Sequence, residues 1–130
     1  MRKTPLKRKS KSETRRTQDL LWQECRRIIK AKYGNTCYTC GKHPLEAQNW
    51  QMGHFIANSV GGASLRYHLA NLRPQCFRCN CDLSGNGAIF YRNLVEREGQ
   101  EYVDELFRIK QQTVKALDHY KSLLEEYKSL

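Results

Sequence analysis

Residues 37–86 read CYTCGKHPLEAQNWQMGHFIANSVGGASLRYHLANLRPQCFRCNCDLSGN, and we expect this stretch to decide the fold. It holds two Cys-x-x-Cys pairs, Cys37/Cys40 and Cys76/Cys79, which supply the four thiolates of a tetrahedral structural zinc site. The gap between the pairs is longer than in common zinc ribbons, so it has room for a hairpin that projects from the metal. A zinc site closed by four thiolates performs no chemistry itself, because no coordination position stays open.

The other cysteines and histidines are weaker candidates for metal ligands. Cys25 lies on an apolar helical stripe and is expected in the core, and Cys81 is out of phase with the second pair, so a local apolar role is expected. His43 and His68 could substitute as ligands, whereas His119 is expected on a helix surface. Paired Cys-x-x-Cys motifs in a chain whose first residues carry no secretory signal favour zinc thiolates over disulfides.

Length and composition favour one small domain. The chain has 130 residues, of which 39% are hydrophobic, so it has little apolar material for a large core, and a metal site would compensate. No stretch approaches the length of a membrane span, so no membrane partner is expected. We expect a reducing, intracellular setting, because free thiolates persist there.

The charge of the chain indicates a polyanionic partner. Its formal net charge is +10, and residues 1–16 hold eight basic side chains against one acid. We expect residues 1–13, which include Lys7, Arg8 and Lys9, to form a disordered basic arm. Two interpretations of this arm are compatible: it keeps the protein in solution, and it tracks the phosphates of DNA through counterion release.

Helical periodicity dominates both ends of the chain. Apolar residues recur at helical spacing over residues 14–34, where we expect a helix that Gly34 ends. Residues 99–130 are expected to form one long or two shorter amphipathic helices, whose apolar stripe packs in the core or forms a dimer seam. Between them we expect, in order, a strand over 50–56, a turn over 58–63, an extended or irregular segment over 64–72, and a helix from residue 80 onward with a break at 84–87 and a regular part over 89–98.

His54 and Asn80 are the candidate catalytic residues. Hydrolysis of a phosphodiester needs a base that activates water and a cation that stabilises the charge developing on the phosphate. A neutral His54 could be the base, and the side-chain oxygen of Asn80 could help to hold Mg²⁺. The zinc site would bring the two residues together, because it ties the helix after Cys79 to the loop ahead of the strand. Each residue also has a structural interpretation, as a packed histidine on a strand and as the N-cap of a helix.

The order of these motifs resembles a known group of nucleases. The likeness rests on Cys37-x-x-Cys40-Gly41, Trp50-x-x-Gly53-His54, Leu65-Arg66, Asn71, Gln75-Cys76-x-x-Cys79-Asn80, Ser84-Gly85-Asn86, Tyr91-Arg92 and Gly99-Gln100-Glu101-x-Val103-Asp104-Glu105. This order is similar to the His-Me finger (HNH, ββα-metal) nucleases that carry a structural zinc, including the endonuclease VII type. It is most similar to the NinG/Rap-type recombination endonucleases of lambdoid phages.

The resemblance implies a fold class. The fold would be α+β and mainly helical, with a zinc-stapled ββα-metal core over 35–98. An N-terminal helix over 14–34 and a C-terminal helical segment over 99–130 would flank this core within a single domain, 14–130.

The resemblance also implies roles for the site residues. His54 would be the general base, Asn71 would brace the loop by hydrogen bonds, and Asn80 would be a ligand of catalytic Mg²⁺ or Mn²⁺. The four paired cysteines would hold structural Zn²⁺. Many members of the wider superfamily have Asp directly before the histidine as a second ligand of the catalytic metal, and this chain has Gly53 there. The residues that could contribute instead are Asp82, Asn86 and Glu96.

The implied function is that of a metal-dependent, structure-specific DNA endonuclease that cuts branched recombination intermediates such as Holliday junctions or D-loops. It would act as a homodimer through the C-terminal helices, in the cytoplasm of the bacterial host. The arginines expected either to contact phosphate or to lie free on the surface are Arg66, Arg73, Arg78 and Arg92. Two alternatives stay open: a sequence-reading HNH endonuclease and a non-catalytic zinc-knuckle module that binds DNA.

Overall fold

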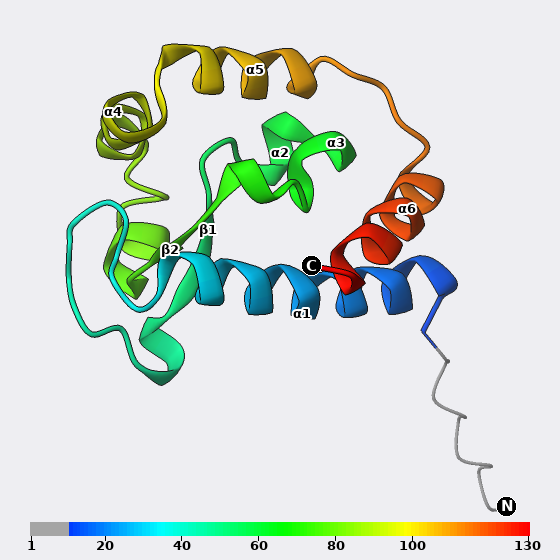
Figure 1. Cartoon of the computed structure of the whole chain (residues 1–130), viewed down its shortest axis with the longest axis horizontal. Helices are drawn as coiled ribbons and strands as arrows, with labels where there is room; N and C mark the ends of the chain where they lie inside the picture. Colours follow the sequence, from blue (N-terminus) through cyan, green and yellow to red (C-terminus); the bar gives the residue numbers. More distant parts are fainter. Residues whose placement is uncertain (1–10) are drawn as a thin grey trace, which may run out of the picture.

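Helices make up most of residues 11–130, the part of the chain that the structure, a computed structural model, describes. The helices and strands are α1 (Glu13–Tyr33), β1 (Gln51–His54), α2 (Asn58–Gly61), α3 (Ala63–Arg66), β2 (Leu72–Gln75), α4 (Gly87–Glu98), α5 (Gln100–Lys110) and α6 (Ala116–Lys128). Short 3-10 turns at Ala47–Asn49 and Leu69–Asn71 and a π-helical turn at Arg78–Asp82 lie between them. The fold is therefore mainly helical α+β with a small sheet, as the sequence predicts (Figure 1).

The long helix α1 begins at a capping serine. Ser12 precedes it, and the Ser12 Oγ accepts a hydrogen bond from the Arg15 N–H at 3.1 Å. The buried residues of this helix lie four residues apart and are Thr17, Leu21, Cys25 and Ile29. The helix lies within one residue of the one expected over 14–34. Because the helix starts at Glu13, that residue is not part of the basic arm expected over residues 1–13. Most of that segment, including Lys7, Arg8 and Lys9, lies outside the described residues.

The two strands form an antiparallel hairpin at the centre of the molecule. Gln51 lies opposite Gln75, and His54 lies opposite Leu72. In an antiparallel pair the side chains of opposed residues share one face of the sheet. His54 therefore lies on the face of Leu72, and Gly53 lies on the other face, opposite Arg73.

Residues 58–66 form two one-turn helices, α2 and α3, where the sequence indicated a turn and an extended segment. Gly62 separates them with a φ of 65°, a conformation that glycine adopts readily. Leu65 on α3 is 1% exposed and packs with Ile56 and Leu106. The expectation was wrong because a single turn is too short to show a helical period in the sequence, whereas long-range packing of Leu65 holds it in place.

The C-terminal segment forms two helices, α5 and α6, and α6 returns to pack on α1 (Figure 1). Three apolar side chains of α6 join the core: Tyr120, Leu124 and Tyr127. The Tyr127 hydroxyl donates to the Tyr67 carbonyl at 2.8 Å. On the α1 side, the Arg27 guanidinium donates to the carbonyls of Tyr127 and Leu130, each at 3.0 Å. The apolar stripe of α6 is thus buried within its own chain, and the homodimer stays a prediction.

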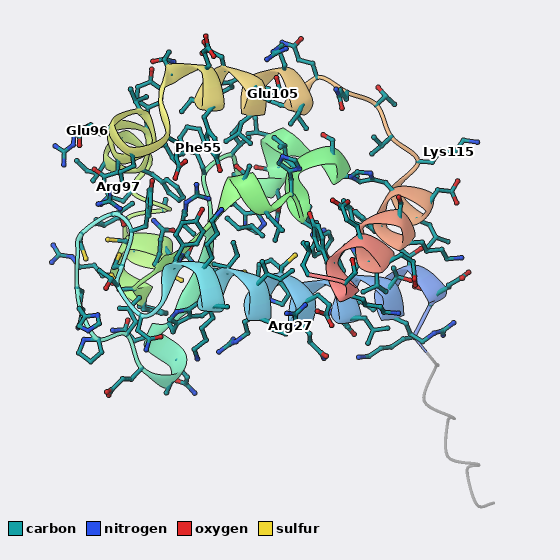
Figure 2. All side chains as sticks on the ribbon, viewed as in Figure 1. Arg27, Phe55, Glu96, Arg97, Glu105 and Lys115 are labelled. Carbon is teal, nitrogen blue, oxygen red and sulfur yellow. The ribbon has the colours of Figure 1, made fainter. Side chains whose placement is uncertain are left out.

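The core consists of three clusters of buried side chains. The largest joins α1 and α6 to the cysteine segments, a second lies under α4, and a third lies under α5. Phe55, the residue after His54, packs against both smaller clusters and points between the strands, α4 and α5 (Figure 2). Within residues 11–130, no helix is long and apolar enough to cross a membrane.

Candidate metal centre and histidine site

The four paired cysteines gather at one point. The sulfur atoms of Cys37, Cys40, Cys76 and Cys79 all lie within 4.8 Å of one another. The Cys40 and Cys76 sulfurs are 3.7 Å apart, and a zinc tetrahedron with Zn–S bonds of about 2.3 Å has edges of about 3.8 Å. All four are free of disulfides. The residues therefore fit the structural zinc that the sequence predicts, and this ion would join the segment before β1 to the segment after β2.

Backbone amides surround these sulfurs. The Cys40 N–H donates to the Cys37 sulfur at 3.5 Å, and the Cys79 N–H donates to the Cys76 sulfur at 3.4 Å. Burial raises the pKa of Cys37, but hydrogen bonds from the Cys40 N–H and the Thr39 hydroxyl outweigh it and lower the pKa to about 6. Burial and the neighbouring sulfurs raise the pKa of Cys40 to about 12. The neighbouring sulfurs thus disfavour a charged Cys40 beside a charged Cys37. A divalent cation would remove this repulsion between thiolates, because it stabilises each thiolate it binds.

His54 stands at the end of β1 with its ring orientation fixed. Its Nε2 lies 2.8 Å from the Arg66 carbonyl oxygen, which can only accept, so Nε2 carries the proton and Nδ1 keeps the lone pair. The ring stacks on Trp22 of α1, with centroids 5.6 Å apart and planes 9° apart. Burial and the charge of Arg66 lower the pKa of His54, although the hydrogen bond to the carbonyl acts in the opposite direction. The side chain is therefore a neutral, oriented base at neutral pH.

Asn80 follows the second cysteine pair and lies in the π-helical turn, so it is not the cap of α4, which Asn86 precedes. Its Nδ2 donates to the Gln51 Oε1 at 2.9 Å, and this contact orients the amide. Within residues 11–130, the Oδ1 of Asn80 accepts no hydrogen bond. This oxygen is thus available to a hard cation such as Mg²⁺.

His54 and Asn80 line the same two cavities, each of about 280 Å³. One lies beside α1, and its other lining residues are Arg15, Gln18, Asp19, Trp22, Met52, Asn58, Arg66 and Tyr67. The second lies beside the turn before α4, and its other lining residues are Ala57, Asn58, Ser84 and Gly85. The structure thus brings together two residues that are far apart in the sequence, at the place where the hairpin meets the cysteine site.

Asn71 holds the loop that carries the Arg66 carbonyl. It is 0% exposed, its Oδ1 accepts from the Ile56 N–H at 2.8 Å, and its Nδ2 donates to the Ile56 carbonyl at 3.0 Å. A longer contact of 3.4 Å joins Nδ2 to the Leu65 carbonyl. Asn71 therefore acts on His54 through the backbone and does not reach the cavities.

Gly53, directly before His54, has no room for a side chain. A Cβ at this position would lie 1.8 Å from the Gln75 Oε1. Gln75 is 0% exposed, and its Nε2 donates to the Thr39 Oγ1 at 3.2 Å and to the Gly85 carbonyl at 2.9 Å. The place of a carboxylate at residue 53 is thus taken by the buried amide of Gln75.

The candidate phosphate-binding arginines divide into three kinds. Arg66 is half-buried and lines a cavity beside His54, whereas Arg78 and Arg92 are exposed and line neither of the two cavities. Arg73 is 0% exposed; it donates to the Tyr102 hydroxyl at 2.8 Å and lies over the Tyr33 ring at 4.4 Å. The expectation for Arg73 was wrong, because this cation is an internal residue of the sheet that aromatic partners distant in sequence enclose.

The alternative metal ligands and the remaining cysteine also lie elsewhere. None of Asp82, Asn86 and Glu96 lines the cavities of His54. Asp82 and Glu96 are exposed, and the Asn86 Nδ2 contacts the Cys79 sulfur at 3.7 Å. Cys81 is exposed, contrary to the apolar role expected for it, and its thiol donates to the Gln51 Oε1 at 3.2 Å. His119 is half-buried rather than on the surface, and its Nε2 has no partner within residues 11–130.

Sequence reasoning missed the contribution of α1. Trp22, Arg15 and Asp19 all line the cavity of His54. Trp22 lies one residue beyond the buried Leu21, so the helical period alone assigned it no particular role. The signal that could have indicated its role is its position: Trp22 is a large aromatic residue beside an apolar stripe that already fills the core, so it is available to line a site.

The fold and this site define a class: small, mainly helical α+β proteins with a tetracysteine site that can hold a metal ion and a histidine–asparagine cavity beside it. The chain belongs to the bacteriophage lambda NinG protein family, whose family model matches residues 1–130. No solved structure matches it.

Curated relatives match part of the chain. The ninG protein of Escherichia phage lambda is 36% identical over 70 residues, which make up 54% of this chain and 33% of that protein. The ninG protein of Salmonella phage P22 is 34% identical over 70 residues, again 54% of this chain and 33% of that protein. The matched region spans about a third of the length of these relatives.

Proposed function

We propose that this chain is a metal-dependent endonuclease of the His-Me finger type that hydrolyses phosphodiester bonds in branched DNA. The observation that carries the proposal is the pairing of His54 and Asn80 in the same cavities, with the base and the free oxygen both oriented. The motif order of the sequence and the NinG family membership support the same function. Strands β1 and β2 and the helical segment after the second cysteine pair would form the ββα-metal unit.

His54 is the general base in this proposal. Its Nδ1 takes a proton from a water molecule, and the oxygen of that water attacks the scissile phosphorus atom. The bond from phosphorus to the leaving oxygen breaks, and that oxygen keeps the electron pair and takes a proton from solvent. Three features prepare the ring for this step. The Arg66 carbonyl fixes the tautomer, and Trp22 covers one ring face. Burial keeps the ring neutral by lowering its pKa. The phosphate being cut would lie near Arg66, whose cation compensates its charge.

Asn80 is the cation ligand in this proposal. The Asn80 Oδ1 would hold a Mg²⁺ or Mn²⁺ ion, which would supply stabilisation for the charge that develops on the phosphate and on the leaving oxygen. The Oδ1 of Asn80 fits this role, because the contact from Nδ2 to Gln51 fixes the amide and leaves Oδ1 unpaired within residues 11–130. Because Gln75 fills the place of a side chain at Gly53, Asn80 has no neighbouring carboxylate from that position, and water would complete the coordination shell.

Replacing His54 with Ala tests this function. Loss of a general base is expected to lower the rate of Mg²⁺-dependent cleavage of a synthetic four-way junction by a factor of about 10²–10⁴. The matched control is His43→Ala, because His43 is exposed, lines neither cavity of His54, and has one side-chain hydrogen bond in the described part of the chain, to Thr36. Unchanged junction cleavage by the His54 variant would overturn the role of this residue.

The same assay separates the alternatives. A structure-specific enzyme cleaves the junction and spares a linear duplex of the same sequence, whereas a sequence-reading endonuclease cleaves both. A non-catalytic zinc module binds the junction without any metal-dependent cleavage. Either of the last two results would replace the proposed function.

The pH dependence of cleavage provides a second readout. The proton must leave His54 before it can act as a base, so the rate should rise with pH through the pKa of His54 and level off above it. Because burial lowers this pKa, the midpoint is expected below the usual value of about 6.5. A midpoint at or above that value in a single-turnover assay would contradict a buried His54 as the base.

A further inference from the structure

The cavity of His54 continues along α1. A larger cavity of about 540 Å³ is lined by Trp22, Arg26, Ala47, Gln48, Trp50, Gln51, Met52 and Asn80. It shares Trp22, Met52 and Asn80 with the cavity that holds His54, and it therefore adjoins that cavity. We call the two together the α1 groove. One wall of this groove is helix α1, and the other is formed by β1 and the segments beside it.

Five α1 side chains line the groove, and Arg15, Trp22 and Arg26 are the three among them that carry the argument. Trp22 follows Arg15 by seven residues and precedes Arg26 by four, which are the spacings of residues on one face. Arg15 and Arg26 are separated by about 16 Å along the helix axis, at a rise of about 1.5 Å per residue. Trp22, which stacks on His54, lies between them, so the two arginines stand on either side of the histidine.

The charge of the α1 groove favours an anion. The Arg26 guanidinium lies 5.1 Å from the centre of the Trp50 ring, and the Lys30 ammonium lies 5.4 Å from it. Among the residues that line the groove, Asp19 has the only carboxylate. It is ion-paired with Lys11 at 2.7 Å and with Arg15 at 3.3 Å, so two cations offset its charge. The groove therefore presents net positive charge on both sides of His54.

We propose that one strand of the DNA substrate runs along α1 through this groove, with Arg15 and Arg26 contacting phosphates on either side of the bond at His54. This inference rests on the proposed function. A span of about 16 Å corresponds to about five nucleotides along a duplex, at about 3.4 Å per nucleotide of each strand. Positive charge and continuity with the His54 site identify the occupant as a DNA strand rather than an apolar ligand.

The test measures DNA binding in protein that carries His54→Ala, so that cleavage does not interfere. Binding of a four-way junction is followed by fluorescence anisotropy over a series of salt concentrations. Binding constants fall as salt rises, so the slope of log K against log salt is negative. Replacing both Arg15 and Arg26 with Gln is expected to make this slope less steep by about two, because each phosphate contact contributes about 0.9. The affinity at low salt should fall as well.

The control removes the same charge elsewhere. Arg108 and Lys128 are exposed, each forms an ion pair on its own helix, and neither lines the groove, so Arg108→Gln with Lys128→Gln is matched to the test pair. An unchanged slope in the α1 variant, or an equal change in both, overturns the inference. Cleavage by the chain with His54 intact is scored separately. If the slope is unchanged but the chain cleaves DNA, the groove inference fails and the proposed function stands. If the slope changes but the chain cleaves no DNA, the groove binds DNA and the proposed function fails.

Discussion

Gly53 shows how a single residue shapes the surroundings of the histidine. The residue before His54 carries no side chain, and the buried amide of Gln75 occupies the space that a Cβ would need. Two hydrogen bonds, to Thr39 and Gly85, hold that amide, so it cannot move aside without losing them. Glycine is required here by contact with a fixed neighbour rather than by an unusual backbone conformation.

Gly53→Ala is therefore expected to lower the free energy of unfolding by about 1–3 kcal/mol, the usual cost of overpacking a buried site. Urea unfolding of the purified variant measures this change. Gly87→Ala is the control, because a Cβ at Gly87 meets nothing within 4 Å, and its effect should stay within about 0.5 kcal/mol. Adding Gln75→Ala to the Gly53 variant should cost less than the sum of the single changes. Equal losses at both glycines would contradict the contact.

At the scale of elements, α1 has two roles. One face packs on α6 through Leu21, Cys25 and Ile29, and the other carries Trp22 and the arginines of the α1 groove. Any loosening of α6 therefore also releases a wall of the groove. Figure 2 shows Arg27, which bonds the last turn of α6, projecting from α1.

Leu124→Ala tests this coupling. Leu124 is buried in α6, and truncating a buried leucine costs about 2–5 kcal/mol of unfolding free energy. Leu20→Ala on α1 is the control, because Leu20 is 50% exposed, and its cost should stay within about 0.5 kcal/mol. Amide hydrogen exchange should also rise along α1 in the Leu124 variant. Faster exchange in α6 alone would show that α1 is held independently.

At the scale of the whole molecule, the cysteine site is the link between the hairpin and the helices around it. It joins a loop after α1 to the turn that carries Asn80, so the position of Asn80 relative to His54 depends on it. The hairpin itself has only two strands and is too small to be stable alone.

Metal removal should therefore destabilise the fold. Loss of an ion present at about 1,000 times its Kd costs about 4 kcal/mol, so a chelator should lower the thermal midpoint strongly. Cys40→Ser should be destabilised to the same extent, and the chelator should have no further effect on it. Cys40 and Cys81 are both exposed, so Cys81→Ser is the matched control and should behave as the native chain does. A chelator response that survives in the Cys40 variant would rule out the four-cysteine site as the source.

The sequence predicted the features that depend on local pattern. The two Cys-x-x-Cys pairs, the buried Cys25 and the break before α4 are all set by spacing or by turn residues. The pairing of His54 with Asn80 also followed, because the cysteine pairs lie next to the segments that carry them.

Features that depend on distant partners were out of reach. Arg73 is buried because Tyr33, Tyr38 and Tyr102 surround its guanidinium, and each of these residues is at least 29 positions away from it along the chain. Trp22 meets His54 across a long sequence separation for the same reason. Contacts of this kind are set by tertiary packing, which no local period reveals.

The bond between Arg27 and Tyr127 has a consequence for the timing of biosynthesis. The two residues are 100 positions apart, so Tyr127 leaves the ribosome well after Arg27. At about 5–20 residues per second, the delay is about 5–20 s. During this interval the nascent α1 lacks its α6 cover, and the groove beside His54 lacks a fixed wall. The α1 groove, through which we propose that a DNA strand runs, is therefore completed only after α6 has been synthesised.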